Sequence, residues 1–312
     1  MKKIYNQNLK KIISFGNMPL ANAFQKKKYL NNYTFKLKLM FNNNFKLVQL
    51  NNYPSPKKMF HNDYAFISST SSFMKRHFFL YSKSIKKMMG NKKFSICEIG
   101  SNDGILLQNF KNNDHVGIEP SKNVFKIAKK KNLNVINEFF NLKLAKKLKI
   151  KKLFYDVICG ANVFCHIPDL ENLFLSVKKI IKKNGILIME EPYLGEMIKK
   201  TSYDQIYDEH IYLFSLHSIN LLASHYELKL FHAEPQLTHG GSMRYYITNN
   251  LKKKRTTKLT KLLYEEKKLG LNSFEKIKKF NKNCALSKKK FQSKINNLIK
   301  KKTKNIWVWS YI

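Results

Sequence analysis

The sequence predicts an α/β protein whose central region is a parallel β-sheet covered by helices on both faces. Between residues 94 and 192, short apolar runs typical of strands alternate with amphipathic helical segments. Strands separated by helices of that length pair in parallel. The first run enters a tight turn, Glu98-Ile99-Gly100-Ser101-Asn102-Asp103-Gly104, and then a helix. This order of strand, glycine turn and helix is typical of a Rossmann-like domain.

The apolar spacing places the individual elements along the chain. A helix is predicted over residues 76–90, where apolar side chains recur on one face. The strands of the central domain are predicted at 94–99, 116–119, 135–136, 154–159 and 185–190, with helices at 105–111, 123–131 and 170–182. Beyond Pro192 we expect a helix at 215–226, strands at 228–230 and 242–248, and a lysine-rich helix or pair of helices within 257–301.

These elements group into three expected domains, which a chain of 312 residues is long enough to form. Residues 1–75 are polar and turn-rich and would form a small substrate-binding module. Residues 76–195 would form the Rossmann-like domain, and residues 196–312 a C-terminal α/β domain. The apolar ending Trp307-Val308-Trp309-Ser310-Tyr311-Ile312 is typical of a strand inside a sheet. We therefore expect the C-terminal domain to be truncated.

The formal net charge of +39 would suit a nucleic-acid partner, but the composition favours another origin. Only three of the 59 basic residues are arginine, and the lysines are spread along the whole chain. Arginine is the usual reader of phosphate and guanine. We therefore attribute the charge to a bias of the whole genome and expect no specific nucleic-acid partner.

Other features of the composition concern the compartment and metals. No apolar stretch is long enough for a transmembrane helix, and the N-terminus lacks the apolar run of a secretory signal. A cytoplasmic protein without a membrane partner is therefore expected. The four cysteines are scattered and form no CxxC pair, which favours buried free thiols over a metal site.

The glycine turn after the first strand is the first candidate site. Gly100 lets the backbone turn sharply, and Gly104 lets a ligand or helix come close. Glu119 ends the next strand, where its carboxylate can accept both hydroxyls of a ribose. The third glycine of a dinucleotide fingerprint is missing, and an adenosyl ligand without a pyrophosphate does not need it. The predicted cofactor contacts are Glu98, Gly100, Asn102, Asp103, Gly104, Glu119 and Asn162.

Three further clusters carry polar side chains suited to chemistry. Asn162 and His166 follow the fourth strand, at the sheet edge where open α/β folds bind ligands. Tyr207-Asp208-Glu209-His210 combines groups that can move a proton near neutral pH. The alternative interpretation of this cluster is an ordinary helix on the surface of the protein. His239-Gly240-Gly241-Ser242-Met243-Arg244 suggests backbone approach to an anion, with an ordinary β-turn as the alternative.

In their order along the chain, these clusters resemble the sugar C-methyltransferases of deoxysugar biosynthesis. The resemblance also takes in Gly16-Asn17-Met18-Pro19-Leu20-Ala21-Asn22-Ala23-Phe24, Leu47-Val48-Gln49-Leu50, Asp63-Tyr64 and Ser68-Ser69-Thr70-Ser71. It implies a class I methyltransferase fold flanked by a small N-terminal module and a C-terminal α/β domain. The implied reaction moves a methyl group from S-adenosylmethionine to a ring carbon of a nucleotide-linked 4-keto-6-deoxy sugar.

The resemblance also implies a role for each cluster. His210 would be the general base that removes the proton next to the ketone, and Glu209 would orient it or bind a sugar hydroxyl. Tyr207 and His166 would donate hydrogen bonds to the enolate oxygen, where fixed donors have their largest effect. Tyr64 and the segment containing Ser69 would hold the sugar, and Arg244 would bind the diphosphate.

The chain departs from the family pattern in two places. The N-terminal module of the family is built around a zinc ion held by four cysteines, and residues 1–50 contain none. Where the second cysteine pair should precede Leu47, the chain reads Asn42-Asn43-Asn44-Phe45. We therefore expect that zinc is lost and that no metal is bound. The family's C-terminal domain also continues well beyond the length of this chain.

Two other functions compete with the methyltransferase interpretation. A nucleic-acid methyltransferase would suit the charge, but Asn162-Val163-Phe164 replaces the proline-tyrosine loop used for base N-methylation. A non-catalytic descendant of the family would explain the missing cysteines and the early ending. The retained clusters at 98–104, 166 and 207–210 oppose it, so the sequence favours an enzyme.

Overall fold

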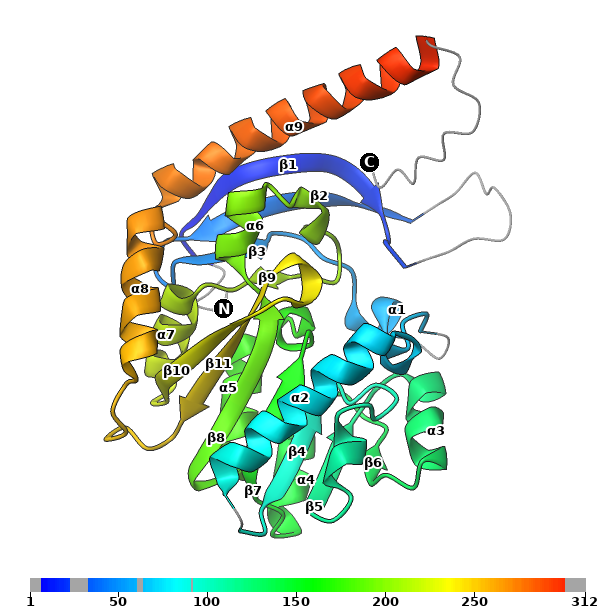
Figure 1. The fold of residues 1–312 in the computed structure, drawn as a ribbon, viewed down its shortest axis with the longest axis vertical. Helices are drawn as coiled ribbons and strands as arrows, with labels where there is room; N and C mark the ends of the chain where they lie inside the picture. The colour runs from blue at the N-terminus through cyan, green and yellow to red at the C-terminus, as the bar shows by residue number, and fades with distance from the viewer. Residues whose placement is uncertain (1–6, 23–32, 61–63, 91, 301–312) are drawn as a thin grey trace.

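The computed structural model describes residues 7–22, 33–60, 64–90 and 92–300. Within these ranges the chain forms a seven-stranded and a four-stranded sheet (Figure 1). Four features noted in the sequence, Ala23, Phe24, Asp63 and the ending at 307–312, lie outside the described residues.

The larger sheet has the strand order β10-β11-β8-β7-β4-β5-β6. Its parallel strands are β4 (Ser95–Ile99), β5 (Asp114–Ile118), β6 (Val135–Ile136), β7 (Tyr155–Ala161) and β8 (Ile181–Pro192). The strand β11 (Ser242–Thr248) pairs antiparallel with β8, and β10 (Lys229–Gln236) pairs antiparallel with β11. The predicted Rossmann-like α/β fold is therefore confirmed.

Both faces of this sheet are buried, because successive side chains of a strand point to opposite faces and each face packs against helices. Val157 and Cys159 of β7 pack with the helix α2 (Ser72–Met89), whereas Ile158 faces the other way. This alternation follows from the two-residue period of a strand. The opposite face is covered by α4 (Leu142–Ile150), α5 (Leu170–Ile180), α7 (Leu216–His225) and α8 (Thr257–Leu269). The short helix α3 (Lys122–Lys130) connects β5 to β6.

Several elements differ from those predicted. Residues 105–111 form only a 3₁₀ turn, Leu107–Phe110, in which Leu107 and Phe110 are buried and Gln108 is exposed. The helix α4 was not predicted, since its lysines hide the apolar spacing of Leu144 and Leu148. Residues 257–301 form the pair α8 and α9 (Phe274–Lys300). The division into domains at residues 75 and 195 stays a prediction.

The N-terminal segment, expected to be rich in turns, forms three strands of the smaller sheet. They are β1 (Leu9–Pro19), β2 (Thr34–Asn42) and β3 (Leu47–Leu50), and β9 (Tyr212–Leu213) joins them in the order β1-β2-β3-β9. Along β2 every second side chain is buried, from Phe35 to Phe41. These side chains pack with Ile277 and Phe280 of α9, which crosses above β1 in Figure 1.

Asparagines close the end of this sheet where β2 turns into β3. The Asn42 side chain accepts a hydrogen bond from the Phe45 backbone N–H at 2.8 Å and donates one to the Gln7 carbonyl at 2.9 Å. Asn8 donates through its side-chain amide to Asn44 at 3.4 Å. The turn is thereby tied to the start of β1.

Among the described helices, none combines the length and apolarity needed to cross a bilayer.

Candidate functional site

A cavity of about 410 Å³ opens at the carboxyl ends of β4, β5, β7 and β8. Its volume falls in the range of roughly 300–1,000 Å³ that small-molecule sites occupy. Open α/β sheets bind their ligands at this edge. The N-terminal segment contributes Phe60 and Tyr64 to the wall, and α2 contributes Met74 and Phe78. The cavity therefore lies between the large sheet and the N-terminal segment.

The glycine turn after β4 forms one side of the cavity. Gly100 has a φ of +66°, and a Cβ atom there would lie 2.5 Å from a methyl carbon of Val163. Gly104 has a φ of +78°, and a Cβ would meet Leu133 at 2.2 Å. Both positions therefore require glycine, for the backbone angle and for the close approach. Gly100 lines the cavity and Gly104 packs behind it.

Asn102 links the glycine turn to the N-terminal segment. Its side-chain oxygen accepts a hydrogen bond from the Ser68 backbone N–H at 3.0 Å, and its amide donates to the Phe66 carbonyl at 3.1 Å. Ser68 lines the cavity, and the predicted Ser69 is its neighbour but does not. The sequence missed this contact, because nothing local pairs residues so far apart in the chain.

Glu119 stands at the end of β5, in the wall of the cavity as predicted. Its carboxylate accepts hydrogen bonds from the backbone N–H groups of Asn102 at 2.9 Å and Ser121 at 2.7 Å. Burial raises the pKa of Glu119, and these two bonds act in the opposite direction. A carboxylate offers about four lone-pair positions, so two remain for the hydroxyls of a ligand.

Two other predicted cofactor residues lie behind the turn and do not line the cavity. Asp103 is buried and forms an ion pair with Lys131 at 3.0 Å. Glu98 is buried beneath the turn, where burial and then the nearby Asp103 and Glu119 raise its pKa well above the usual range. Their placement supports the shape of the turn rather than direct contact with a ligand.

Beyond β7, aromatic rings form a row that starts at the cavity wall with Phe60 and His166 and continues behind it. His166 is stacked between Phe60 and His210, with ring centroids 5.4 Å apart on each side. Tyr207 follows His210 at a centroid distance of 4.2 Å. His166 lines the cavity, and its Nε2 atom is buried without a hydrogen-bond partner among the described residues. The predicted residues Tyr207, His210 and His166 are thus neighbours.

The hydrogen bonds of His210 fix its tautomer. Its Nδ1 atom lies 2.8 Å from the Gln205 carbonyl oxygen, which can only accept, so Nδ1 carries the proton. Its Nε2 atom therefore accepts from the Tyr207 hydroxyl at 2.9 Å. Burial lowers the pKa of His210 to about 4. The ring is consequently a neutral base whose free electron pair is held by a phenol.

The acidic residues beside His210 are held by the N-terminal segment. Asn22 donates to the Glu209 carboxylate at 2.6 Å, and the Tyr64 hydroxyl donates to it at 3.4 Å. The Ala21 backbone N–H donates to Asp208 at 3.0 Å. The predicted orienting contact from Glu209 to His210 is not formed, since Gln205 fills that role. Burial raises the pKa of Glu209 to about 7.

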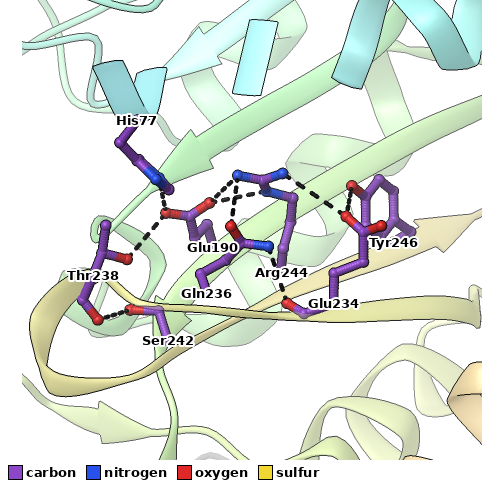
Figure 2. Close-up of polar contacts among 8 residues, drawn as sticks. All are labelled: His77, Glu190, Glu234, Gln236, Thr238, Ser242, Arg244 and Tyr246. Atoms are coloured by element: carbon purple, nitrogen blue, oxygen red, sulfur yellow. Dashed lines mark hydrogen bonds and ion pairs between the residues drawn. The ribbon is translucent and has the colours of Figure 1, made fainter. Parts of the chain in front are cut away.

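Arg244, predicted to hold a diphosphate, is buried and engaged within the protein. Its guanidinium donates two hydrogen bonds to Glu190 of β8, at 2.6 and 2.9 Å (Figure 2). The guanidinium also stacks 3.8 Å above the ring of Tyr81. The other Glu190 oxygen lies 2.6 Å from His77 of α2. These surroundings do not fit a diphosphate contact by Arg244, and Glu190 itself reaches the cavity wall.

Cys165, His166 and His210 form the one group of possible metal ligands found within the described ranges. The two imidazole planes are inclined by only 17° and stacked, so their in-plane electron pairs cannot converge on one ion. Burial also raises the pKa of the Cys165 thiol, which opposes the thiolate that metals require. The group is therefore a poor metal site.

Comparison with known families gives three matches along the chain. Residues 71–233 match a family described as a methyltransferase domain, which is more than half of the chain. Residues 5–60 match a putative zinc binding domain, and residues 237–311 match a C-methyltransferase C-terminal domain.

Individual proteins that are similar to this chain are named as methyltransferases. The C-methyltransferase NovU of Streptomyces niveus is 28% identical over 150 residues, which cover 47% of this chain and 36% of NovU. The match thus spans little more than a third of that relative. A solved SAM-dependent methyltransferase of Thermotoga maritima is 19% identical, with a TM-score of 0.43 over 57% of this chain and 92% of its own. Magnesium protoporphyrin IX methyltransferase of Synechocystis with bound SAM is 12% identical, with a TM-score of 0.42 over 56% and 79%.

The matched zinc binding domain does not fit the residues present. Residues 1–60 contain no cysteine, histidine, aspartate or glutamate, the side chains that bind zinc. The loop expected to carry cysteines is instead closed by the hydrogen bonds of Asn42 and Asn8. The apolar contacts of β2 with α9 supply the core of this module. Its stability therefore comes from packing and hydrogen bonds.

A chelator is accordingly expected to leave the melting temperature unchanged, and the purified protein should contain less than one zinc per chain. Replacing Asn42 by alanine should lower stability by about 1–3 kcal/mol, because it leaves the Phe45 N–H without its acceptor. The exposed neighbour Asn43, changed to alanine, is the control. Stoichiometric zinc whose removal lowers the melting temperature would contradict this account.

Proposed function

Since the chain belongs to the family of S-adenosylmethionine-dependent C-methyltransferases, we propose that it methylates a carbon next to a ketone in a nucleotide-linked deoxysugar. The observation that carries the proposal is the neutral His210–Tyr207 pair, stacked on His166 at the wall of the cavity. A cytoplasmic location is part of the same proposal.

The cofactor supplies an electrophilic methyl group. Gly100, Asn102 and Asn162 would surround it, and Glu119 would accept hydrogen bonds from its ribose. The Asn162 side-chain oxygen is buried without a partner among the described residues, so it can accept from a bound cofactor. The left-handed backbone of Asn102 and Asn162, with φ of 48° and 55°, shapes this side of the cavity.

Removal of the α-proton is assigned to His210. Its Nε2 electron pair takes the proton through the Tyr207 hydroxyl, which already donates to it. A pKa of about 4 keeps the ring neutral and ready at neutral pH. The negative charge that develops on the enolate favours the imidazolium as the proton arrives. The fixed Nδ1 bond to Gln205 holds the ring in its basic tautomer.

His166 is assigned to the enolate oxygen, because its ring lines the cavity beside His210. Burial lowers the pKa of His166, so it donates as a neutral imidazole. Tyr64 and Glu209 are assigned to a sugar hydroxyl, next to the same row of rings. The bound cofactor would supply the methyl group that the enolate carbon accepts, with S-adenosylhomocysteine as the leaving group. Each positioned donor of this kind typically contributes about 10²–10³ in rate.

The test is to incubate the protein with S-adenosylmethionine and thymidine-diphosphate-linked 4-keto-6-deoxyglucose in D₂O. We expect deuterium at the carbon next to the ketone and a product with a new C-methyl signal in the NMR spectrum. A methyl group found on oxygen or nitrogen, or no transfer at all with bound cofactor, would contradict the proposal.

Glu209 gives the proposed reaction a pH dependence near neutrality. Ionised Glu209 accepts hydrogen bonds from Asn22 and Tyr64, and its pKa is raised to about 7 by burial. As the pH falls through 7, its protonation removes an acceptor, and the KM for the sugar should rise. Glu209→Gln should flatten this profile, whereas the control Glu138→Gln, in a partly exposed ion pair with Lys147, should keep it. Identical profiles in wild type and Glu209→Gln would exclude this role.

A further inference from the structure

The turn before β11, Thr238–Gly240, brings a histidine to the cavity that no role above uses. His239 lines the cavity together with Glu190 and Ser242, on the side of the sheet formed by β8 and β11. In Figure 2, Thr238 and Ser242 mark the two ends of this turn. The cofactor turn lies on the other side of β7, at β4 and β5. His239 therefore belongs to the end of the cavity away from Glu119.

The turn is held firmly by its neighbours. The Thr238 hydroxyl donates to Glu190 at 3.4 Å, and the Ser242 hydroxyl donates to the Thr238 carbonyl at 3.0 Å (Figure 2). The Tyr193 N–H donates to the Gly241 carbonyl at 3.0 Å. Because Glu190 is itself fixed by Arg244 and His77, the buried ion pair sets the position of this turn.

The backbone of His239 is left-handed, with φ 50° and ψ 40°, and Gly240 and Gly241 follow with positive φ. This conformation is costly for most residues, and such strain collects at functional sites. Asparagine fills five of the ten left-handed non-glycine positions among the described residues. His239 is one of the other five, and it is the one among them that lines the cavity.

The ring of His239 has no hydrogen-bond partner within the described ranges, although it is half-buried. Its pKa is lowered by burial and by His77, while Glu190 acts in the opposite direction. A positive charge on His239 would in turn lower the pKa of both His166 and His210. A neutral imidazole offers one donor and one acceptor to a ligand.

We propose that His239 binds the acceptor, by a hydrogen bond between its ring and an oxygen of a carbonyl sugar held in the cavity. The inference rests on the proposed function and extends it, since it assigns the β8–β11 side of the cavity to the acceptor. The cofactor is bound on the side of β4 and β5. His239 takes no part in proton removal, which stays with His210.

The test compares His239→Asn and His239→Gly with wild type by calorimetry. Both replacements adopt a left-handed backbone readily, so they remove the ring and keep the turn. The ligands are S-adenosylhomocysteine, and thymidine-diphosphate-linked 4-keto-6-deoxyglucose added to the saturated complex. We expect sugar affinity to fall about tenfold, the loss of one hydrogen bond, with unchanged affinity for S-adenosylhomocysteine. Leu237→Ala, an exposed residue next to the same turn, is the control and should match wild type.

Unchanged sugar affinity in both His239 variants would overturn the inference. An equal loss of affinity for S-adenosylhomocysteine would overturn it too, because the ring would then serve the cofactor. Failure of the proposed function is visible separately, in wild type. A wild-type protein that binds S-adenosylhomocysteine and not the sugar would refute the acceptor class, and with it the inference.

Discussion

Replacing His210 by alanine is expected to slow methyl transfer by about 10²–10⁴-fold, the usual contribution of a positioned general base. Affinity for S-adenosylhomocysteine should not change, because the cavity residues assigned to the cofactor, Gly100 and Glu119, are untouched. The physical reason is the loss of the Nε2 electron pair, which accepts from Tyr207 at 2.9 Å.

The measurement is exchange of the sugar α-proton with D₂O, which isolates proton removal from methyl transfer. Tyr207→Phe removes only the hydroxyl and should reduce exchange as well, since the proton passes through that group. His115→Ala, a histidine at the far end of β5, is the matched control. Exchange at the wild-type rate in His210→Ala would remove His210 as the base.

Replacing Arg244 by methionine is expected to lower the free energy of unfolding by about 3–5 kcal/mol, the cost of leaving one partner of a buried ion pair alone. Burial by itself would raise the pKa of Glu190, but the hydrogen bonds from His77 and Arg244 lower it below its usual value. Without the guanidinium, a buried carboxylate would keep only the His77 and Thr238 contacts.

Urea unfolding measures this effect. The double variant Glu190→Gln/Arg244→Met should recover part of the stability, because no charge is then left buried without its partner. Arg255→Met serves as the matched control, since Arg255 is exposed and donates a hydrogen bond to the uncharged side chain of Asn220. A loss below about 1 kcal/mol in Arg244→Met, typical of a surface pair, would show that the ion pair is not important for stability.

The fold of the central domain could be predicted because its strands are short apolar runs between helices of regular length. The smaller sheet could not be predicted, because the exposed positions of β1 and β2, such as Lys10, Lys11 and Lys36, are mostly polar and make both strands look polar as a whole. Their buried faces pack on α9, more than 230 residues later in the chain.

Some residues of the candidate site could likewise be predicted from the sequence, and others could not. Gly100 and Glu119 were found because each stands directly after a strand, and His166 because it lies in the loop after β7, where parallel topology places side chains together. The sequence predicted a diphosphate contact for Arg244 and missed its ion pair with Glu190, because Glu190 was assigned only to the end of an apolar strand. Only the antiparallel pairing of β11 with β8 brings Arg244 opposite Glu190. The contact of Asn102 with Ser68 is equally invisible in the sequence.

Binding of S-adenosylhomocysteine, followed by thermal unfolding, tests the central claim most directly. At a ligand concentration of 100 times Kd, the protein should gain about 2.7 kcal/mol and melt at a higher temperature. Glu119→Ala should lose most of this gain, because Glu119 lines the cavity beside the glycine turn. No stabilisation of the wild-type protein by either S-adenosylmethionine or S-adenosylhomocysteine would contradict the account.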